Sequence, residues 1–165
     1  VHSLIRMLAR YPNNNFVLIA PPELQMPEDI LTELDNDGVG YVLTDNLEDN
    51  LPEADILYMT RIQQERFVDF AQYQALKGIY VLDAEKMKLA KEEMIVLHPL
   101  PRVDEISTDI DEDPRAWYFK QAQMGVYVRM ALMILLLELH HELGEEVFYV
   151  HTTEKRPGGR LPHGA

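Results

Sequence analysis

The chain has 165 residues, of which 47% are hydrophobic and 26% charged, a composition typical of one soluble globular domain. Its 28 acidic and 15 basic residues give a net charge of −13, which argues against non-specific binding to nucleic acids or anionic membranes, because both require a positive surface. The absence of cysteine excludes disulfides and thiolate metal sites. We therefore expect small molecules or proteins as partners, and the cytoplasm as the default location.

Apolar patterning predicts helices and strands that alternate along the chain. Leu4, Ile5 and Leu8 have helical spacing, and this first helix should end before Pro12. Further helices are expected over 27–34 and 84–91, in the acidic segment before residue 55, and in the segment before residue 79. Continuous apolar runs predict five strands, over 16–20, 39–43, 55–59, 79–82 and 94–97. This alternation predicts an α/β fold with a doubly wound, Rossmann-like parallel sheet that carries helices on both faces.

The C-terminal part of the chain predicts one long helix followed by a tail. The helix is expected from Pro114 to about Leu143, and its stretch from Met130 to Leu137 is apolar on every side. A membrane span is the competing interpretation, but the uncharged run is well under the ~20 residues that a bilayer crossing needs. We therefore expect a helix buried between protein layers, and a flexible tail over 144–165.

Two polar segments follow predicted strands, where an open α/β sheet binds its ligands. In the first, Arg61 and Gln63 are two residues apart in extended chain, so that their side chains point the same way. An arginine fork beside an amide suits a carboxylate ligand. The alternative is a solvated cluster of ion pairs formed by Arg61, Glu65 and Arg66, with no functional meaning.

The second segment is the sequence HPLPR, residues 98–102. Pro99 and Pro101 stop the strand, fix their own φ angles and bias the preceding residues toward extended geometry. The segment therefore offers backbone carbonyls with few local N–H partners, and a ligand could supply the donor. The alternative is a proline turn at a strand end without a binding role.

Neither the histidines nor the acidic residues predict a metal site. His140 and His141 are adjacent on a helix and point about 100° apart, with no third ligand at a helical offset. The acidic residues between positions 104 and 113 lack the central glycine and the bidentate glutamate of a calcium loop. We expect them to form an acidic loop that caps the long helix.

Three stretches together resemble a known family. Residues 55–66, 96–106 and 114–122 are similar in order and spacing to the aspartate-binding domain of aspartate carbamoyltransferases, and the likeness runs from residue 1 to about residue 139. Ornithine carbamoyltransferases usually have cysteine at the position of Pro99, so this sequence resembles the aspartate enzymes. Gln123 and Met124 depart from the family pattern.

The resemblance implies transfer of a carbamoyl group from carbamoyl phosphate to L-aspartate, in pyrimidine biosynthesis, with no metal or organic cofactor. It implies that Arg61 and Gln63 hold the carboxylates of aspartate, and that the carbonyls of Pro99 and Leu100 accept from the carbamoyl NH₂ and the attacking amine. It also implies a cis peptide between Leu100 and Pro101. The resemblance gives supporting roles to four further residues: Arg66, Arg102, Asp104 and Arg129.

The resemblance also implies that parts of the family's protein are absent from this sequence. The carbamoyl phosphate domain and the first strand of the sheet have no counterpart, so we expect a fragment, inactive alone, whose complete form is a homotrimer. We expect residues 1–143 to form the aspartate-binding domain. The alternatives are a non-catalytic carbamoyltransferase-like module for binding or assembly, or a carbamoyltransferase for another amino acid.

Overall fold

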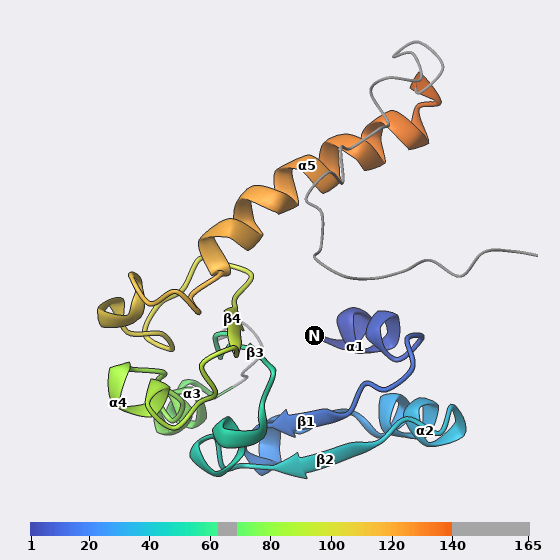
Figure 1. Cartoon of the computed structure of the whole chain (residues 1–165). Helices are drawn as coiled ribbons and strands as arrows, with labels where there is room; N and C mark the ends of the chain where they lie inside the picture. Colours follow the sequence, from blue (N-terminus) through green and yellow to red (C-terminus); the bar gives the residue numbers. More distant parts are fainter. Residues whose placement is uncertain (63–68, 140–165) are drawn as a thin grey trace, which may run out of the picture. The chain divides into compact units, whose positions relative to one another are not determined.

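The structure is a computed structural model that describes residues 1–62 and 69–139 (Figure 1). It divides within helix α5 (Tyr118–Leu136) into a unit of residues 1–122 and a second unit from residue 123 onward, and each is considered by itself. In the part that is described, no helix combines the length and the apolarity that a bilayer crossing requires. The predicted tail over 144–165 lies outside the described residues.

The strands of the first unit are parallel, as the alternating pattern predicts. β1 pairs with β2 in a register that sets Phe16 opposite Tyr41, and β3 pairs with β4 in a register that sets Ile56 opposite Ile95. The four strands are β1 (Phe16–Ile19), β2 (Tyr41–Thr44), β3 (Ile56–Tyr58) and β4 (Ile95–Leu97). Four of the five predicted strands are therefore confirmed, with bounds that differ from the prediction by at most two residues.

The described strands form two separate two-stranded sheets rather than one continuous sheet. Strand order is β1–β2 in one and β3–β4 in the other, and no described segment pairs with both β1 and β3. The parallel α/β class is thus confirmed, while the two pairs of strands stay unconnected by backbone hydrogen bonds within the described residues.

The predicted strand over 79–82 is wrong. Only Leu82 pairs, in an isolated parallel bridge with Ile106, where the Leu82 N–H donates to the Glu105 carbonyl at 2.9 Å. Leu82 is fully buried, whereas Ile79 is exposed, so this apolar run is not covered along its length. Gly78, with φ of +73°, ends the preceding helix directly before the run and leaves little length for a strand.

The helices agree with the predicted order. Helix α2 (Glu28–Asn36) begins after Pro27, and α4 (Ala84–Met87) begins after Asp83, whose carboxylate caps it by accepting from the Lys86 N–H at 2.9 Å. The α-helices of the first unit besides α5 are α1 (His2–Leu8), α2 (Glu28–Asn36), α3 (Phe70–Leu76) and α4 (Ala84–Met87). Short 3₁₀ helices among the described residues are η1 (Pro22–Leu24), η2 (Glu48–Glu53) and η4 (Thr108–Ile110).

The long helix starts later than predicted, at Tyr118 instead of Pro114. The preceding residues pair with β4 as an isolated bridge between Val96 and Ala116, in which the Val96 N–H donates to the Arg115 carbonyl at 2.8 Å and the Trp117 N–H donates to the Val96 carbonyl at 3.0 Å. These extended residues cannot also be helical. The described part of the helix ends at Leu136, and residues 140–143 of the prediction lie outside the described residues.

Two groups of buried side chains hold the first unit together. The larger group lies around β3 and β4 and includes Leu82, Val96 and Tyr118, each fully buried. The smaller group packs Ile5 of α1 and Leu34 of α2 with their neighbours against the β1–β2 sheet. Burial of this apolar surface supplies the main stabilising free energy of the unit.

Candidate functional site

The carboxyl ends of β3 and β4 lie side by side. In the register of this sheet Tyr58 is opposite Leu97, and the Met59 N–H donates to the Leu97 carbonyl at 2.9 Å. Arg61 follows β3 and the segment from His98 follows β4, so the two predicted binding segments leave the sheet at one edge. This is the edge where parallel α/β sheets bind their ligands.

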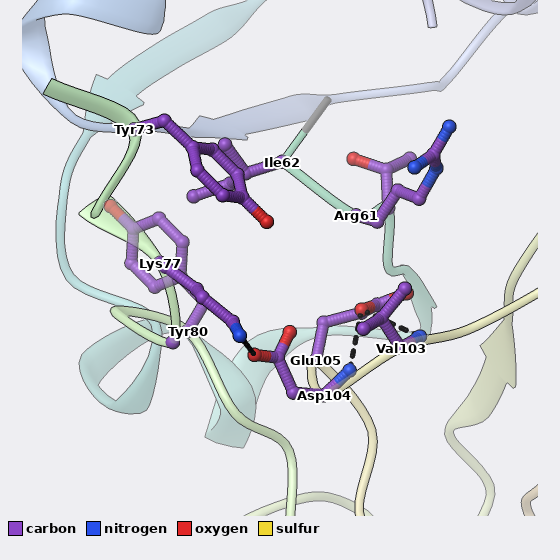
Figure 2. A pocket seen from close by; sticks show the side chains of 10 residues that line it. Arg61, Ile62, Tyr73, Lys77, Tyr80, Val103, Asp104 and Glu105 are labelled. Carbon is purple, nitrogen blue, oxygen red and sulfur yellow. Dashed lines mark hydrogen bonds and ion pairs between the residues drawn. The ribbon is translucent and has the colours of Figure 1, made fainter. Parts of the chain in front are cut away.

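A pocket opens beside this edge (Figure 2). It brings together two of the predicted site residues, Arg61 and Asp104, with Lys77 and Asp104 on one side of the view and Arg61 on the other. Lys77 Nζ lies 3.8 Å from Asp104 Oδ2, and both side chains are about half exposed, so water weakens this pair. The lining residues are Thr60, Arg61, Ile62, Tyr73, Lys77, Gly78, Tyr80, Val103, Asp104 and Glu105.

The segment after β4 adopts an unusual backbone. The peptide between Leu100 and Pro101 is cis, as expected, and Leu100 has φ of +46°, in the left-handed region that residues with a Cβ seldom adopt. Pro99 is exposed and Leu100 half-buried. Across the described residues no hydrogen bond reaches the carbonyl oxygen of either residue. Both carbonyls therefore fit the predicted role of acceptors for a ligand.

Arg102 is committed to a carboxylate within the protein. Its guanidinium donates two hydrogen bonds to Asp111, one of them at 2.6 Å, and lies over the ring of Tyr118. The Tyr118 hydroxyl donates to Asp111 Oδ1 at 2.6 Å. The Arg102 hydrogen bonds hold the pKa of Asp111 below its usual range, whereas burial, together with the Asp111 contact, raises the pKa of Tyr118 to about 12. Arg102 thus ties the loop after β4 to the start of α5.

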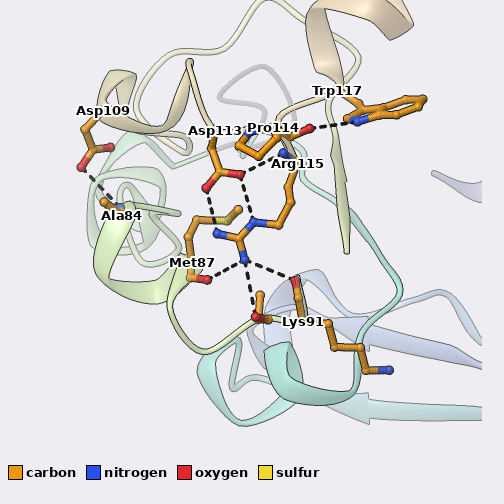
Figure 3. Close-up of polar contacts among 9 residues, drawn as sticks. Ala84, Met87, Lys91, Asp109, Asp113, Pro114, Arg115 and Trp117 are labelled. Carbon is orange, nitrogen blue, oxygen red and sulfur yellow. Dashed lines mark hydrogen bonds and ion pairs between the residues drawn. The ribbon is translucent and has the colours of Figure 1, made fainter. Parts of the chain in front are cut away.

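A second arginine fastens the residues that precede α5 (Figure 3). Arg115 donates to the Asp113 carboxylate through Nε at 2.9 Å and Nη2 at 2.8 Å. Its Nη1 donates to the carbonyls of Met87, Ala90 and Lys91, at and beyond the end of α4, at 2.9, 3.4 and 3.3 Å. Asp111 and Asp113 of the acidic run therefore each anchor an arginine, in place of the predicted helix cap.

Three of the predicted site residues are not placed beside the others by the structure. Gln63 and Arg66 lie outside the described residues. Arg129 belongs to the second unit, where it is exposed and close to Gly125, and its place beside the other candidates stays a prediction. The described ranges contain no group of three histidine or acidic side chains placed to hold a metal ion.

Three residues of this region were missed by sequence reasoning. His98 and Glu105 are buried, at 1% and 5% exposure, and His98 Nε2 lies 2.6 Å from Glu105 Oε1. Lys77, which lines the pocket, was also missed. The signal available was the histidine directly after a buried strand with an acidic residue seven positions later, but spacing alone does not distinguish such a pair from exposed charges.

Known proteins identify the family of the chain. The family described as "Aspartate/ornithine carbamoyltransferase, Asp/Orn binding domain" matches residues 1–136. The chain belongs to this family. The extent of the match agrees with the likeness expected from the three sequence stretches.

Named relatives within the carbamoyltransferase family are similar in sequence over the same region. The chain is 59% identical over 138 residues to the aspartate carbamoyltransferase catalytic subunit of Clostridium perfringens strain SM101, covering 83% of the chain and 45% of that relative. It is 58% identical over 137 residues to the corresponding subunit of Clostridium kluyveri, again covering 83% and 45%. The chain therefore spans about half the length of these relatives.

Solved structures of aspartate transcarbamoylases have the same fold as this member of the family. The M. jannaschii catalytic subunit matches with a TM-score of 0.75 at 40% identity, covering 86% of the chain and 45% of that structure. The Trypanosoma cruzi enzyme in complex with carbamoyl phosphate and aspartate matches with a TM-score of 0.72 at 43% identity, covering 80% of the chain and 44% of that structure. The α/β architecture of the chain is thus that of the carbamoyltransferases.

Proposed function

We propose that this chain is the aspartate-binding half of an aspartate carbamoyltransferase, which transfers a carbamoyl group from carbamoyl phosphate to L-aspartate in pyrimidine biosynthesis. The observation that carries the proposal is the parallel pairing of β3 and β4, because it sets Arg61 and the loop after His98 at one edge. The similarity to named aspartate carbamoyltransferase catalytic subunits supports the choice of reaction.

In this proposal the two segments have different tasks. Arg61 and Gln63 bind the carboxylates of aspartate, and the carbonyl oxygens of Pro99 and Leu100 accept hydrogen bonds from the carbamoyl NH₂ and the attacking amine. Asp104 and Arg102 maintain the shape of the loop, which fits their bonds to Lys77 and Asp111. Arg66 and Arg129 keep supporting roles by resemblance alone.

The chemistry that these groups serve is an acyl transfer. The α-amine of aspartate forms a bond to the carbamoyl carbon, the bond from that carbon to the phosphate oxygen breaks, and the amine loses one proton as phosphate leaves. Fixed acceptors aid this step by orienting the amine and the NH₂, and most of the rate gain comes from such positioning and charge stabilisation. Groups that bind the phosphate are expected in the half of the relatives that this chain does not match.

We further propose that a strand outside this chain completes one doubly wound sheet by lying between β1 and β3. Backbone N–H groups alternate between the two edges of a strand. Phe16 and Ala20 donate toward β2, and Met59 donates toward β4. By this alternation the amides of Val17 and Ile19 in β1, and of Ile56 and Tyr58 in β3, point to the opposite edges. Those opposite edges are where the added strand would pair.

Hydrogen exchange tests the completed sheet. Adding the unmatched half of the C. perfringens subunit to the chain is expected to slow exchange at the amides of Val17, Ile19, Ile56 and Tyr58, because each gains a hydrogen-bond acceptor. The matched controls are the amides of Phe16, Ala20 and Met59, whose acceptors are already present. Protection that rises equally in both sets would contradict a strand between β1 and β3.

Complementation tests the reaction itself. The chain alone is expected to form no carbamoyl aspartate from carbamoyl phosphate and aspartate, and a mixture with the unmatched half of the C. perfringens subunit is expected to form it. Product is measured by a colorimetric or chromatographic assay, with each half alone as control. Carbamoylation of ornithine by the mixture, or no product at all from a mixture that associates, would refute the proposed function.

We also propose a homotrimer for the complete enzyme and a domain boundary near residue 143, followed by a tail over 144–165. The family resemblance supports the trimer, and the change in composition after Gly144 supports the boundary. The cytoplasm stays the default proposal for location.

A further inference from the structure

His98 and Glu105 form a buried acid–histidine pair within the loop after β4. His98 is 1% exposed and Glu105 5%, and His98 Nε2 lies 2.6 Å from Glu105 Oε1. Neither side chain has a part in substrate binding in the proposed function. A buried carboxylate is costly unless its oxygens accept several hydrogen bonds, so the presence of this pair calls for a reason.

The other ring nitrogen of His98 holds the backbone of Leu100. The Leu100 N–H donates to His98 Nδ1 at 2.8 Å. Because Nδ1 accepts this bond, it carries no hydrogen, and the hydrogen of the neutral ring lies on Nε2, where it is donated to Glu105. The hydrogen-bond partners therefore assign the Nε2–H tautomer.

Glu105 is itself fixed in place by the loop that it closes. Its Oε2 accepts the N–H groups of Val103 and Asp104, each at 3.1 Å. The backbone carbonyl of Glu105 accepts from the Leu82 N–H. At the other end of the loop, the backbone N–H of His98 donates to Gln121 Oε1 at 2.8 Å. Burial raises the pKa of Glu105, but the backbone N–H groups and His98 together outweigh it and hold the pKa below the usual range. The carboxylate is therefore charged and oriented when it meets the ring.

The hydrogen bond to His98 is made by Leu100, the residue of this turn with a positive φ angle. Leu100 has φ of +46°, which a residue with a Cβ adopts only where its surroundings impose it, and such residues gather at functional sites. The carbonyl oxygens of Pro99 and Leu100 lie on either side of the N–H that His98 holds. A change in this turn would move both acceptors.

We propose that Glu105 is a positioning residue for carbamoyl transfer: it keeps His98 in the Nε2–H tautomer, which leaves Nδ1 to hold the Leu100 N–H and so fixes the carbonyls of Pro99 and Leu100. The inference rests on the proposed function, which assigns those carbonyls to the substrates. It adds the two side chains that hold the acceptors in place.

Glutamine at position 105 separates this role from simple packing. Glutamine has one acceptor oxygen and one NH₂ group, whereas Glu105 accepts at both oxygens. If the amide oxygen accepts the two backbone N–H groups, the NH₂ faces His98 Nε2 and drives the hydrogen to Nδ1, where it opposes the Leu100 N–H. The opposite rotamer sets the NH₂ against two backbone donors.

The first measurement determines the tautomer of His98 in the 165-residue chain from the ¹⁵N chemical shifts of the ring nitrogens. The His98 signals are assigned by their absence in His98→Asn. The expected result is the Nε2–H tautomer in the wild type and its loss in Glu105→Gln, with no change in Glu93→Gln, an exposed acid before β4. An Nδ1–H ring in the wild type overturns the inference without touching the proposed function.

The second measurement is steady-state kinetics of the mixed halves. Glu105→Gln is expected to lower kcat on the order of 10- to 100-fold with a smaller change in KM for aspartate, because the residues that bind its carboxylates are intact. His98→Asn offers an amide oxygen that can accept the N–H two residues later, so it is expected to retain more kcat than His98→Leu.

The double variant decides between positioning and general loss of structure. In His98→Asn there is no imidazole tautomer to control. Adding Glu105→Gln to this variant is therefore expected to lower kcat by a much smaller factor than it does in the wild type. Equal losses in both backgrounds, or unchanged kcat in Glu105→Gln, overturn the inference. If Glu105→Gln does not fold, the wild-type tautomer and the contrast between His98→Asn and His98→Leu decide it. No product from the wild-type halves refutes the proposed function, and with it the reaction to which Glu105 is assigned.

Discussion

Arg61→Ala is expected to raise the KM for aspartate and lower kcat in the mixed halves, with a combined loss in kcat/KM of about 2–4 kcal/mol, roughly 30- to 1000-fold. The physical reason is the loss of a guanidinium that binds a carboxylate through two parallel hydrogen bonds. Arg61 lines the pocket at the carboxyl edge of β3, where such a contact is available. Steady-state kinetics with aspartate varied at saturating carbamoyl phosphate measures the effect.

Two further variants sharpen this test. Arg61→Lys keeps the charge without the planar fork, so its loss should lie between those of the wild type and Arg61→Ala. Arg10→Ala removes an exposed arginine beyond α1 and should leave both constants unchanged. Normal kinetics in Arg61→Ala would remove this residue from the aspartate site and return it to the alternative of a surface ion pair.

Asp111→Asn is expected to lower the free energy of unfolding of the chain by about 2–4 kcal/mol at neutral pH. The side chains of Arg102 and Asp111 are only 17% and 24% exposed, and the carboxylate accepts from Arg102 and from the Tyr118 hydroxyl. An amide accepts at one atom and turns donor protons toward the guanidinium, which leaves a mostly buried charge unpaired. Urea unfolding followed by circular dichroism measures the change.

The matched control and the acid dependence of stability check the cause. Glu85→Gln makes the same chemical change in a highly exposed pair with Lys88 and should cost under about 0.5 kcal/mol. Because the Arg102 hydrogen bonds lower the pKa of Asp111 from 3.8, its stabilisation is complete above about pH 5 and is lost as pH falls below 3.8. The difference in the free energy of unfolding between the wild type and Asp111→Asn should therefore become smaller in acid. A difference that does not change with pH would assign the loss to packing.

Periodicity and proline chemistry were enough to predict most of the fold. Short apolar runs that end in proline or a polar residue gave β1 and β4, since such runs need cover on both faces. The pattern wrongly predicted a strand ending at Leu82, because a run of apolar residues does not determine how many of them pair with a neighbouring strand. The pattern failed again before Tyr118. The residues there were predicted to be helical, but they pair with β4, a tertiary contact that local propensity cannot predict.

The candidate site was predictable only in part. The two segments that follow β3 and β4 could be found from the rule that parallel strands bind ligands at their carboxyl ends, and their adjacency is confirmed. The roles of Arg61 and the Pro99 and Leu100 carbonyls came from family resemblance and stay predictions. The His98–Glu105 pair could not be predicted, because burial decides whether two such residues form a pair, and burial is a property of the fold.

The bridge at Val96 closes one side of the β3–β4 sheet. Ile95 and Leu97 bond toward β3, whereas Val96 bonds toward Arg115 and Trp117, so the backbone of β4 has partners along both edges. A sheet closed on one side grows in one direction only. A strand added to this sheet, whether from the proposed second half or from another copy during aggregation, has to enter beside β3. At the β3–β4 sheet, correct assembly and misassembly therefore compete for one edge, and whichever chain pairs with β3 first blocks the other.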